Sequence, residues 1–232
     1  MEPNQTLKEQ LAAGRDEASV SADEYRKSRK LPPCQGASWA IWGEKTYDLS
    51  IFENEEEALE KLRKDVVLIG ANFGLGGEGG DFKSFKSFQN FHATTGSDTK
   101  LRRGLTGTEL EGVFLTDLVK DYPSAYATGL AREVKKGALD LGEHVVSPFL
   151  AEQKALGLTS ETLYIPMGAK TRELWDLLVA RKAIPAEQRV FHREFGNGPP
   201  FRGRPVLNLT HYSAAVNMTK AVKALLGQRS LG

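Results

Sequence analysis

The sequence predicts an α/β protein, specifically a three-layer α/β/α sandwich with a mainly parallel central sheet. Short runs of β-branched and other apolar residues recur along the chain, and each is preceded or followed by a segment with helical periodicity. Continuous apolar runs are typical of strands covered on both faces, and strands that alternate with helices favour a parallel sheet. Ligands bind such sheets at the carboxyl ends of the strands, so the residues after each strand are the first candidates for a site.

The elements follow in a regular order along the 232 residues. We expect residues 1–35 to form a polar N-terminal arm, with helical segments at Thr6–Arg15 and Ala22–Lys30 that Pro32 and Pro33 end. Residues 36–232 are expected to form one domain. Its predicted strands are Val66–Gly70, Gly112–Thr116, Leu163–Met167 and Pro205–Leu209, with a short strand or packing segment in Ser38–Tyr47. Its predicted helices are Asn54–Lys64, Ala127–Lys136, Ser147–Leu156, Lys170–Arg181 and Ala214–Leu226.

The charge of the chain is balanced overall but unevenly distributed. Lys and Arg number 31 against 30 Asp and Glu, a net charge of +1, which excludes a disordered polyelectrolyte. Residues 170–232 nevertheless carry 11 basic and 4 acidic side chains, a net charge of +7, whereas residues 1–69 sum to −4 and residues 70–169 to −2. The basic end would attract a phosphate-bearing partner if its cations share a face; the alternative is an ordinary solvated surface.

Cysteine content and hydropathy indicate the compartment. The single cysteine, Cys34, cannot form an internal disulfide, as is usual for reduced cytosolic proteins. No apolar stretch approaches the roughly 18 to 20 residues that span a bilayer, and the first ten residues lack the layout of a secretory signal. We therefore expect a cytoplasmic protein with no membrane partner, acting as a monomer.

A glycine-rich loop, Gly70–Gly80, follows the first main strand. Its Gly74–Gly79 segment formally matches the dinucleotide fingerprint G-x-G-x-x-G, but no helix begins in the loop to hold a pyrophosphate. The missing Gly-Lys-Ser/Thr ending excludes a P-loop. The loop is either a site of close backbone approach to a ligand or a plain glycine loop at the sheet edge.

Aromatic and basic residues follow this loop. Phenylalanines recur at every third position, which predicts one side of a helix or 3₁₀ turn, and core packing is the default meaning. The alternative is a base-stacking surface beside basic side chains. The residues are Phe82, Phe85, Phe88 and Phe91, interleaved with Lys83, Lys86, Asn90 and His92. Further along, Lys100, Arg102 and Arg103 form either a phosphate-contacting edge or a solvated turn.

Polar residues stand at the ends of three predicted strands. Asn72 follows the first, Thr116 and Asp117 the second, and His211 the last. Each could be a helix cap, but the carboxyl ends of parallel strands converge. An amide, a carboxylate and an imidazole close together are sufficient for general acid/base or electrophilic chemistry on a small polar ring.

Three segments resemble motifs of the uracil-DNA glycosylase superfamily, particularly its mismatch-specific uracil/thymine and single-strand-selective branches. Gly70-Ala71-Asn72-Phe73-Gly74 is similar to the family's G-x-N-P-G, whose Asn positions the hydrolytic water. The segment Gly112–Val119 is similar to G-[IV]-G-[FL]-T-N-[LM]-V, and His211-Tyr212-Ser213 to the H-P-S motif. The resemblance covers about Val66 to Leu226. The chain departs from the family at Phe73, Asp117 and Tyr212, and in the glycine insertion Gly76–Gly80.

The resemblance implies a DNA-repair hydrolase that flips out uracil or a related deaminated base from DNA and cleaves its N-glycosidic bond. It implies Asn72 and His211 as catalytic residues. The implied base-binding residues are Phe73, Phe85, Phe88, Phe91, Asn90, Thr116 and Asp117, and the implied DNA-phosphate-binding residues are Gly74, Gly76, Lys100, Arg102, Arg103 and Ser213. An ionised Asp117 accepts from a ring N–H but cannot donate to a carbonyl, so bases that offer extra donors should be favoured over uracil.

No cofactor is expected. The four histidines are widely spaced, and one cysteine cannot hold the four-cysteine iron–sulfur cluster of some superfamily branches. Two other functions stay open. The altered motifs and the basic C-terminal quarter suit a catalytically weak or inactive nucleic-acid-binding protein with the same fold, and the glycine loop leaves a nucleotide-cofactor enzyme as a third reading.

Overall fold

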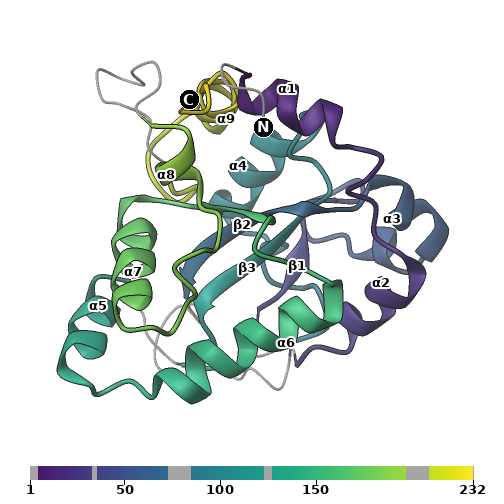
Figure 1. Ribbon diagram of the computed structural model, residues 1–232. Coiled ribbons are helices and arrows are strands. Elements are labelled where there is room, and N and C mark those ends of the chain that lie inside the picture. Colours follow the sequence, from purple (N-terminus) through teal and green to yellow (C-terminus); the bar gives the residue numbers. More distant parts are fainter. Residues whose placement is uncertain (1–4, 33–35, 73–84, 123–126, 197–208, 232) are drawn as a thin grey trace.

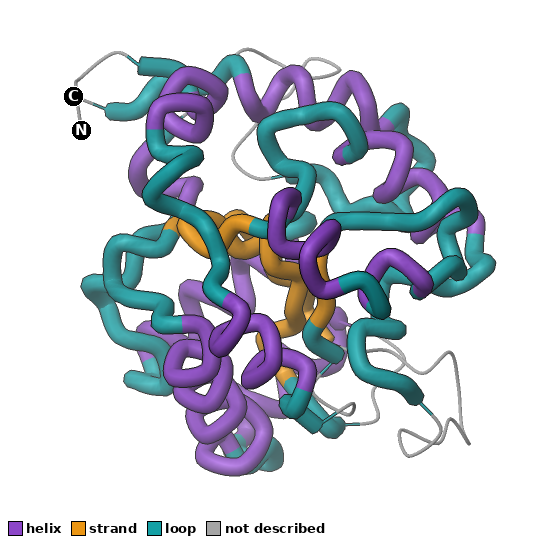
Figure 2. The backbone as a smooth tube through the Cα atoms, turned by 90° about the vertical axis from the view of Figure 1, so that its right-hand side faces the viewer, coloured by secondary structure: helices purple, strands orange, loops and turns teal. Residues whose placement is uncertain are grey.

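The computed structural model describes residues 5–32, 36–72, 85–122, 127–196 and 209–231. Its centre is an open sheet in the order β1-β3-β2-β4, in which β2 is parallel to both β3 and β4 and β1 pairs antiparallel with β3. Figure 2 shows these strands in the middle of the molecule with helices around them. The predicted α/β class with a mainly parallel sheet is therefore confirmed. The strands are β1 (Ser38–Trp39), β2 (Arg63–Asn72), β3 (Val113–Val119) and β4 (Leu163–Pro166).

The last predicted strand falls largely on residues that the structure does not describe. Of Pro205–Leu209 only Leu209 is described, and it forms a parallel bridge with Met167, just after β4. The backbone N–H of Gly168 donates to the carbonyl of Leu209 at 2.6 Å. The chain at Leu209 thus lies beside the end of β4, on the side away from β2.

Most helices lie where the apolar periodicity predicts them. The helices are α1 (Leu7–Ala13), α2 (Ala22–Arg29), α3 (Glu55–Lys61), α4 (Gly96–Leu105), α5 (Ala127–Lys136), α6 (Ser147–Leu156), α7 (Ala169–Ala180), α8 (Phe191–Glu194) and α9 (Met218–Leu226), with a 3₁₀ turn at Ser50–Phe52 and a π-helical turn at Gly142–Val146. The last helix begins at Met218 rather than Ala214, because Asn217 caps it by accepting from the backbone N–H of Lys220 at 3.1 Å. Among the described helices, none is long and apolar enough to cross a bilayer.

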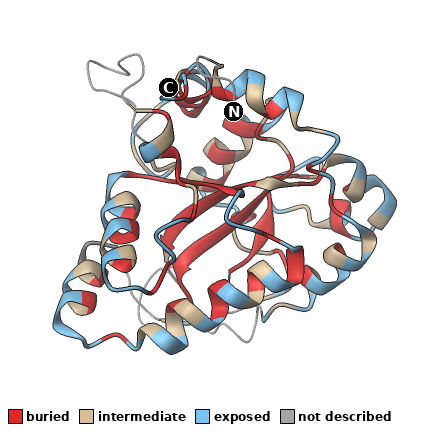
Figure 3. Cartoon of the chain, in the orientation of Figure 1, coloured by how far each residue is buried: buried red, intermediate tan, exposed pale blue. Residues whose placement is uncertain are grey.

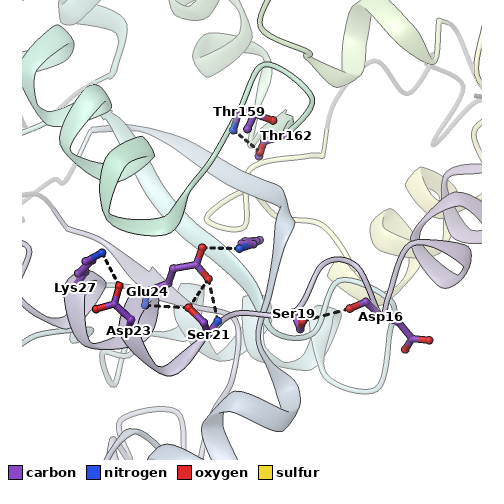
Figure 4. Close-up of polar contacts among 9 residues, drawn as sticks. Asp16, Ser19, Ser21, Asp23, Glu24, Lys27, Thr159 and Thr162 are labelled. Carbon is purple, nitrogen blue, oxygen red and sulfur yellow. Dashed lines mark hydrogen bonds and ion pairs between the residues drawn. The ribbon is translucent and has the colours of Figure 1, made fainter.

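The N-terminal segment is packed onto the rest of the chain. Both α1 and α2 begin with a capping box, and in α2 the Ser21 hydroxyl and the Glu24 carboxylate satisfy each other's backbone N–H groups (Figure 4). The side chains of Leu7 and Leu11 are buried, and the buried Tyr25 donates its hydroxyl proton to the carbonyl of Phe52 at 2.8 Å. Residues expected to form an arm therefore contribute to the core.

Side chains of β2 alternate between two apolar clusters. Val66 and Leu68 pack with residues of α1, α4 and α9, whereas Val67 and Ile69 pack with residues of α5, α6 and α7. In Figure 1, α1, α4 and α9 lie on one side of the sheet and α5, α6 and α7 on the other. Figure 3 shows the strands buried along most of their length, as continuous apolar runs predict.

Candidate active site

The order of the strands directs attention to the carboxyl end of β2. From β2 the chain crosses to β3 on one side and later to β4 on the other side of β2. A crevice opens outside the carboxyl ends of the strands where the winding direction reverses in this way, and ligands bind open α/β sheets there. Asn72 is the last residue of β2 and therefore stands at this reversal point.

Asp117 is directly opposite Gly70 on the neighbouring strand, and only 4% of the residue is exposed. A Cβ atom on residue 70 would lie 2.1 Å from Oδ1 of Asp117, so the carboxyl group occupies the space that a side chain on residue 70 would need. The side chain of Asn72 projects from the same face of β2, because residues two apart on a strand share a face. The structure thus brings Asn72 and Asp117 to one face of the sheet on neighbouring strands, with Asp117 two residues before the end of β3.

Burial sets the protonation of Asp117. Loss of water raises the pKa of this carboxyl to about 7, although the charge of Lys120 and a hydrogen bond from Asn90 both act to lower it. At neutral pH the carboxyl group is therefore partly protonated, whereas the prediction from the sequence assumed an ionised carboxylate. A neutral carboxyl group has both an O–H donor and a carbonyl acceptor, as an amide does.

Asn90 holds the Asp117 carboxyl in place. Its Nδ2 donates to Oδ2 of Asp117 at 3.0 Å and to the carbonyl of Gly36 at 2.7 Å, while its Oδ1 accepts from the backbone N–H of Phe91 at 3.0 Å. The neighbouring residues Phe88 and Phe91 adopt positive φ angles of 64° and 66°. Asn90 therefore sits in a tight, irregular turn in place of the regular helix or 3₁₀ turn that the aromatic spacing predicts.

His211 lies beside the end of β4. Gly168 has a φ of 100°, and a Cβ atom on it would lie 2.9 Å from Cβ of His211, so glycine is needed for this approach. The backbone N–H of Ser213 donates to Nδ1 of His211 at 3.2 Å, and the Ser213 hydroxyl oxygen is 2.7 Å from the same nitrogen. Burial lowers the pKa of His211, which favours the neutral ring. With Nδ1 accepting, the proton of the neutral ring is on Nε2, which is a hydrogen-bond donor.

Tyr212 lies between His211 and Phe91, and it was not among the predicted site residues. Its ring stacks on His211 with centroids 4.6 Å apart and contacts the ring of Phe91 edge-on at 6.0 Å. Burial raises the pKa of the Tyr212 phenol far above its usual range, and the nearby carboxylates of Asp117 and Asp98 act in the same direction. The only signal in the sequence was its position in the His211-Tyr212-Ser213 motif.

Thr116 lies on the opposite face of β3 from Asp117. Its hydroxyl donates to Oε1 of Glu152 at 2.6 Å, and the ammonium group of Lys120 contacts both Thr116 and Glu152. Only 2% of Lys120 and 2% of Glu152 is exposed. The structure therefore joins Thr116 to a buried ion pair and does not bring it together with Asp117.

The predicted aromatic platform divides between the two apolar clusters. Phe88 is buried with its ring 5.0 Å from that of Phe52 and 5.8 Å from that of Tyr25, and Phe91 belongs to the other cluster beside Tyr212. Phe85 is half-buried, and Phe73 lies outside the described residues. Of these rings, Phe91 is the one that the described contacts connect to His211, through Tyr212.

The predicted phosphate-binding residues do not all lie beside the His211 loop. Lys100 donates to the carbonyl of Ala214 at 3.3 Å and so lies against the His211 loop, and Ser213 is part of that loop. Arg102 points elsewhere, because its guanidinium donates to the carbonyls of Gly43 and Glu44. Arg103 is exposed, and Gly74 and Gly76 lie outside the described residues.

Across the part of the chain that the structure describes, no cluster of histidine, cysteine and carboxylate side chains is arranged to hold a metal ion. The described side chains of the candidate site are an amide, a partly protonated carboxyl group, a neutral imidazole and a tyrosine ring. Comparisons of the chain with protein-family models, with curated proteins and with solved structures found no match.

Proposed function

We propose that this protein is a DNA-repair hydrolase of the uracil-DNA glycosylase type, built on a three-layer α/β/α sandwich, which cleaves the N-glycosidic bond of uracil or a related deaminated base. The observation that carries the proposal is the placement of Asn72 at the end of β2, Asp117 near the end of β3 and His211 beside the end of β4, around the reversal point of the sheet. A nucleotide must leave the DNA stack to reach such a crevice, which costs a few kcal/mol and least in mispaired or single-stranded DNA.

Asn72 would orient the attacking water. Cleavage of an N-glycosidic bond builds positive charge on the sugar and negative charge on the departing base, so the water attacks an oxocarbenium-like carbon. Such a carbon needs a well-placed water more than a strong base, and an amide can hold a water molecule by hydrogen bonds but cannot deprotonate it effectively. This role suits a base that leaves readily.

His211 would stabilise the departing base. Its contacts with Ser213 favour a neutral ring with the proton on Nε2, and a neutral donor can hydrogen-bond to the oxygen that gains negative charge. A preorganised donor of this kind contributes about 3 kcal/mol to transition-state stabilisation. Ser213 would act as a positioning residue for the imidazole.

Asp117 would read the edge of the base in two ways. Below a pH of about 7 its carboxyl group is mainly neutral and can both donate to a carbonyl and accept from a ring N–H, as recognition of uracil requires. Above that pH the carboxylate only accepts, which favours bases with more donors. The choice of base should therefore change with pH.

A second candidate is a nucleic-acid-binding protein with little or no catalytic activity. The observation that favours it is the position of Tyr212, which covers one face of the His211 ring, together with the almost complete burial of Asp117. Under this proposal the same edge of the sheet contacts nucleic acid, but no base reaches Asp117.

The experiment measures base release from oligonucleotides that carry uracil, hypoxanthine or xanthine, followed by alkaline strand cleavage. We expect release of at least one base, with loss in Asn72→Ala and His211→Ala. His192→Ala is the matched control, because its imidazole pairs with Asp176 on α7 and lies outside the candidate site. The second candidate is supported if all three oligonucleotides bind without cleavage. Release that survives in both site variants would overturn the assignment of the site.

A Tyr212→Ala variant separates the two candidates further. If the tyrosine ring restricts access to a working site, its removal should raise the rate of base release. If the site is inactive, the variant should bind nucleic acid and still release nothing. Asp117→Asn, compared with the wild type at pH 6 and pH 8, tests base reading, because an amide does not titrate in this range.

A further inference from the structure

Helices α4 and α9 lie side by side and carry five basic residues. Arg102 donates to the carbonyls of Gly43 and Glu44. We call the other four, Lys100, Arg103, Lys220 and Lys223, the α4–α9 surface. The helices are joined where the Thr219 hydroxyl donates to the carbonyl of Arg103 at 3.4 Å. Arg103 supplies the carbonyl of this contact, Lys220 follows Thr219 on α9, and Lys223 lies one turn further along that helix. Arg103, Lys220 and Lys223 are exposed, and Lys100 is half-buried.

In the described part of the chain, no neighbouring carboxylate pairs with the cations of this surface. Among the described residues, none of the four basic side chains forms an ion pair. Asp98 is the only acidic residue of α4, and it is buried and accepts from the backbone N–H of Ala93 at 2.8 Å. Residues 209–231 contain no Asp or Glu.

The surface is continuous with the candidate active site. Lys100 donates to the carbonyl of Ala214, whose own backbone N–H donates to the carbonyl of His211 at 2.9 Å. The loop 211–217 then leads directly into α9. A chain of phosphates that passes the His211 loop would therefore meet Lys100 first and the cations of α9 beyond it.

The apolar residues of these helices point inward, which argues against a membrane surface as the partner. Met218, Val222 and Leu225 of α9 are buried in the cluster that also contains Leu101 and Leu105 of α4. The large apolar residues that are exposed in the described part of the chain are Tyr47, Leu150 and Leu231, none of them on α4 or α9. Membrane-surface helices bury an apolar face in the lipid, and neither helix has such a face to spare.

We propose that the α4–α9 surface binds the phosphodiester backbone of the nucleic acid beside the candidate active site, with Arg103, Lys220 and Lys223 as phosphate contacts that do not depend on base identity. The proposal rests on the proposed function in taking DNA as the ligand, but it requires no catalysis. It assigns a role to Lys220 and Lys223, which none of the sequence motifs includes. Contacts of this kind release counterions and weaken with salt.

The test uses the full chain and a fluorescent DNA duplex with no damaged base, with binding measured by anisotropy from about 50 to 200 mM salt. The variant is the triple substitution Arg103→Gln, Lys220→Gln and Lys223→Gln. The control is Lys135→Gln, Lys136→Gln and Lys154→Gln, which removes the same charge from exposed positions of α5 and α6. Thermal unfolding checks that both triple variants fold.

We expect the α4–α9 variant to bind at least tenfold more weakly and to lower the steepness of log K against log salt by about 2 to 3, since each phosphate contact contributes about 0.9. The control should match the wild type, and Lys220→Arg with Lys223→Arg should retain binding because the charge remains. Equal loss in both triple variants, or an unchanged salt slope, would overturn the proposal. So would binding of the wild type to vesicles of anionic lipid but not to DNA.

These outcomes are separate from those for the proposed function, because the duplex contains no base to excise. Base release without any change of salt slope in the α4–α9 variant would reject the surface and keep the hydrolase. Weakened binding in the variant, with no base released from any oligonucleotide, would keep the surface and reject the hydrolase.

Discussion

Gly70 and Asp117 are complementary residues on neighbouring parallel strands, since a Cβ atom on Gly70 would lie 2.1 Å from Oδ1 of Asp117. Atoms that are not bonded do not approach so closely, so a larger residue at position 70 would force the carboxyl group or the strand to move. The space over Gly70, two residues before the end of β2, is thus occupied by a side chain of β3.

We expect Gly70→Ala to destabilise the fold by about 1 to 3 kcal/mol, because an extra methyl group meets a carboxyl oxygen in a packed interior. Urea unfolding measures this change. Adding Asp117→Ala should recover part of the loss, which a double-mutant cycle reports as coupling between the two positions. Gly129→Ala in α5 is the control: its Cβ meets no atom within 4 Å, and alanine favours a helix, so stability should rise. Independent effects at positions 70 and 117 would contradict the steric account.

Asp117→Asn should stabilise the protein at alkaline pH and change little at pH 4. The pKa of Asp117 is raised from 3.8 to about 7 in the folded state, so the unfolded chain loses its proton first and folding becomes less favourable as pH rises between these values. Each pKa unit corresponds to about 1.4 kcal/mol, so the gain at pH 8 should be a few kcal/mol. Denaturant unfolding at both pH values measures it, with exposed Asp121→Asn as control. An equal effect at pH 4 and pH 8 would reject titration as the cause.

His92 should make the protein sensitive to acid. Burial lowers its pKa from 6.5 to about 4, and its Nε2 lies 3.3 Å from the carbonyl of Trp39. Its contribution to stability is therefore complete above pH 6.5 and is lost as pH falls toward 4, because only the unfolded chain accepts the proton readily. His92→Phe keeps an aromatic ring beside Trp42 and Phe52 but cannot titrate. Its stability should fall less steeply over this range than that of the wild type, even if it is lower at neutral pH.

The buried ion pair of Lys120 and Glu152 should be far more sensitive to single than to double substitution. Lys120→Met leaves the Glu152 carboxylate without its cation in the core and should cost about 3 to 5 kcal/mol. The double variant Lys120→Met, Glu152→Met removes both charges and should recover most of that loss. Chemical unfolding of the wild type, the single variant and the double variant measures the difference. A double variant as unstable as the single one would indicate that the pair is needed for packing and not only for charge balance.

The elements that the sequence predicted correctly are those with a strong local signal. The run Val66–Gly70 is too apolar for a surface, and α5 and α6 have the predicted bounds because their periodicity is clear. Helix α4 was missed, since Gly96 and Gly104 weaken its helical signal. Position 104 needs glycine because a Cβ atom there would lie 2.8 Å from Cβ of Met218, a residue more than a hundred positions further along the chain. Local propensity contains no trace of such a contact.

In the candidate site too, features with a local signal could be predicted from the sequence, and features that depend on distant segments could not. The apolar run placed Asn72 at the end of its strand, and it is the last residue of β2. Asp117 was expected just after its strand, but β3 continues to Val119, so Asp117 is opposite Gly70 within the sheet. The protonation of Asp117, its bond to Asn90 and the stacking of Tyr212 on His211 depend on segments that meet only in the folded chain. Thr116 differs from its neighbour Asp117 because adjacent strand residues face opposite sides, and the sequence does not say which side holds the site.

The close approach of α4 and α9 at Gly104 also determines how the basic residues of these helices are presented. The backbone of α4 at Gly104 packs directly against Met218 of α9, which leaves little freedom for one helix to slide along the other. The intervals between Arg103, Lys220 and Lys223 are consequently a property of the scaffold. For a polyanion that matches those intervals, the two helices are already in position. On the protein side, the conformational entropy lost on binding is then mainly that of the Arg103, Lys220 and Lys223 side chains.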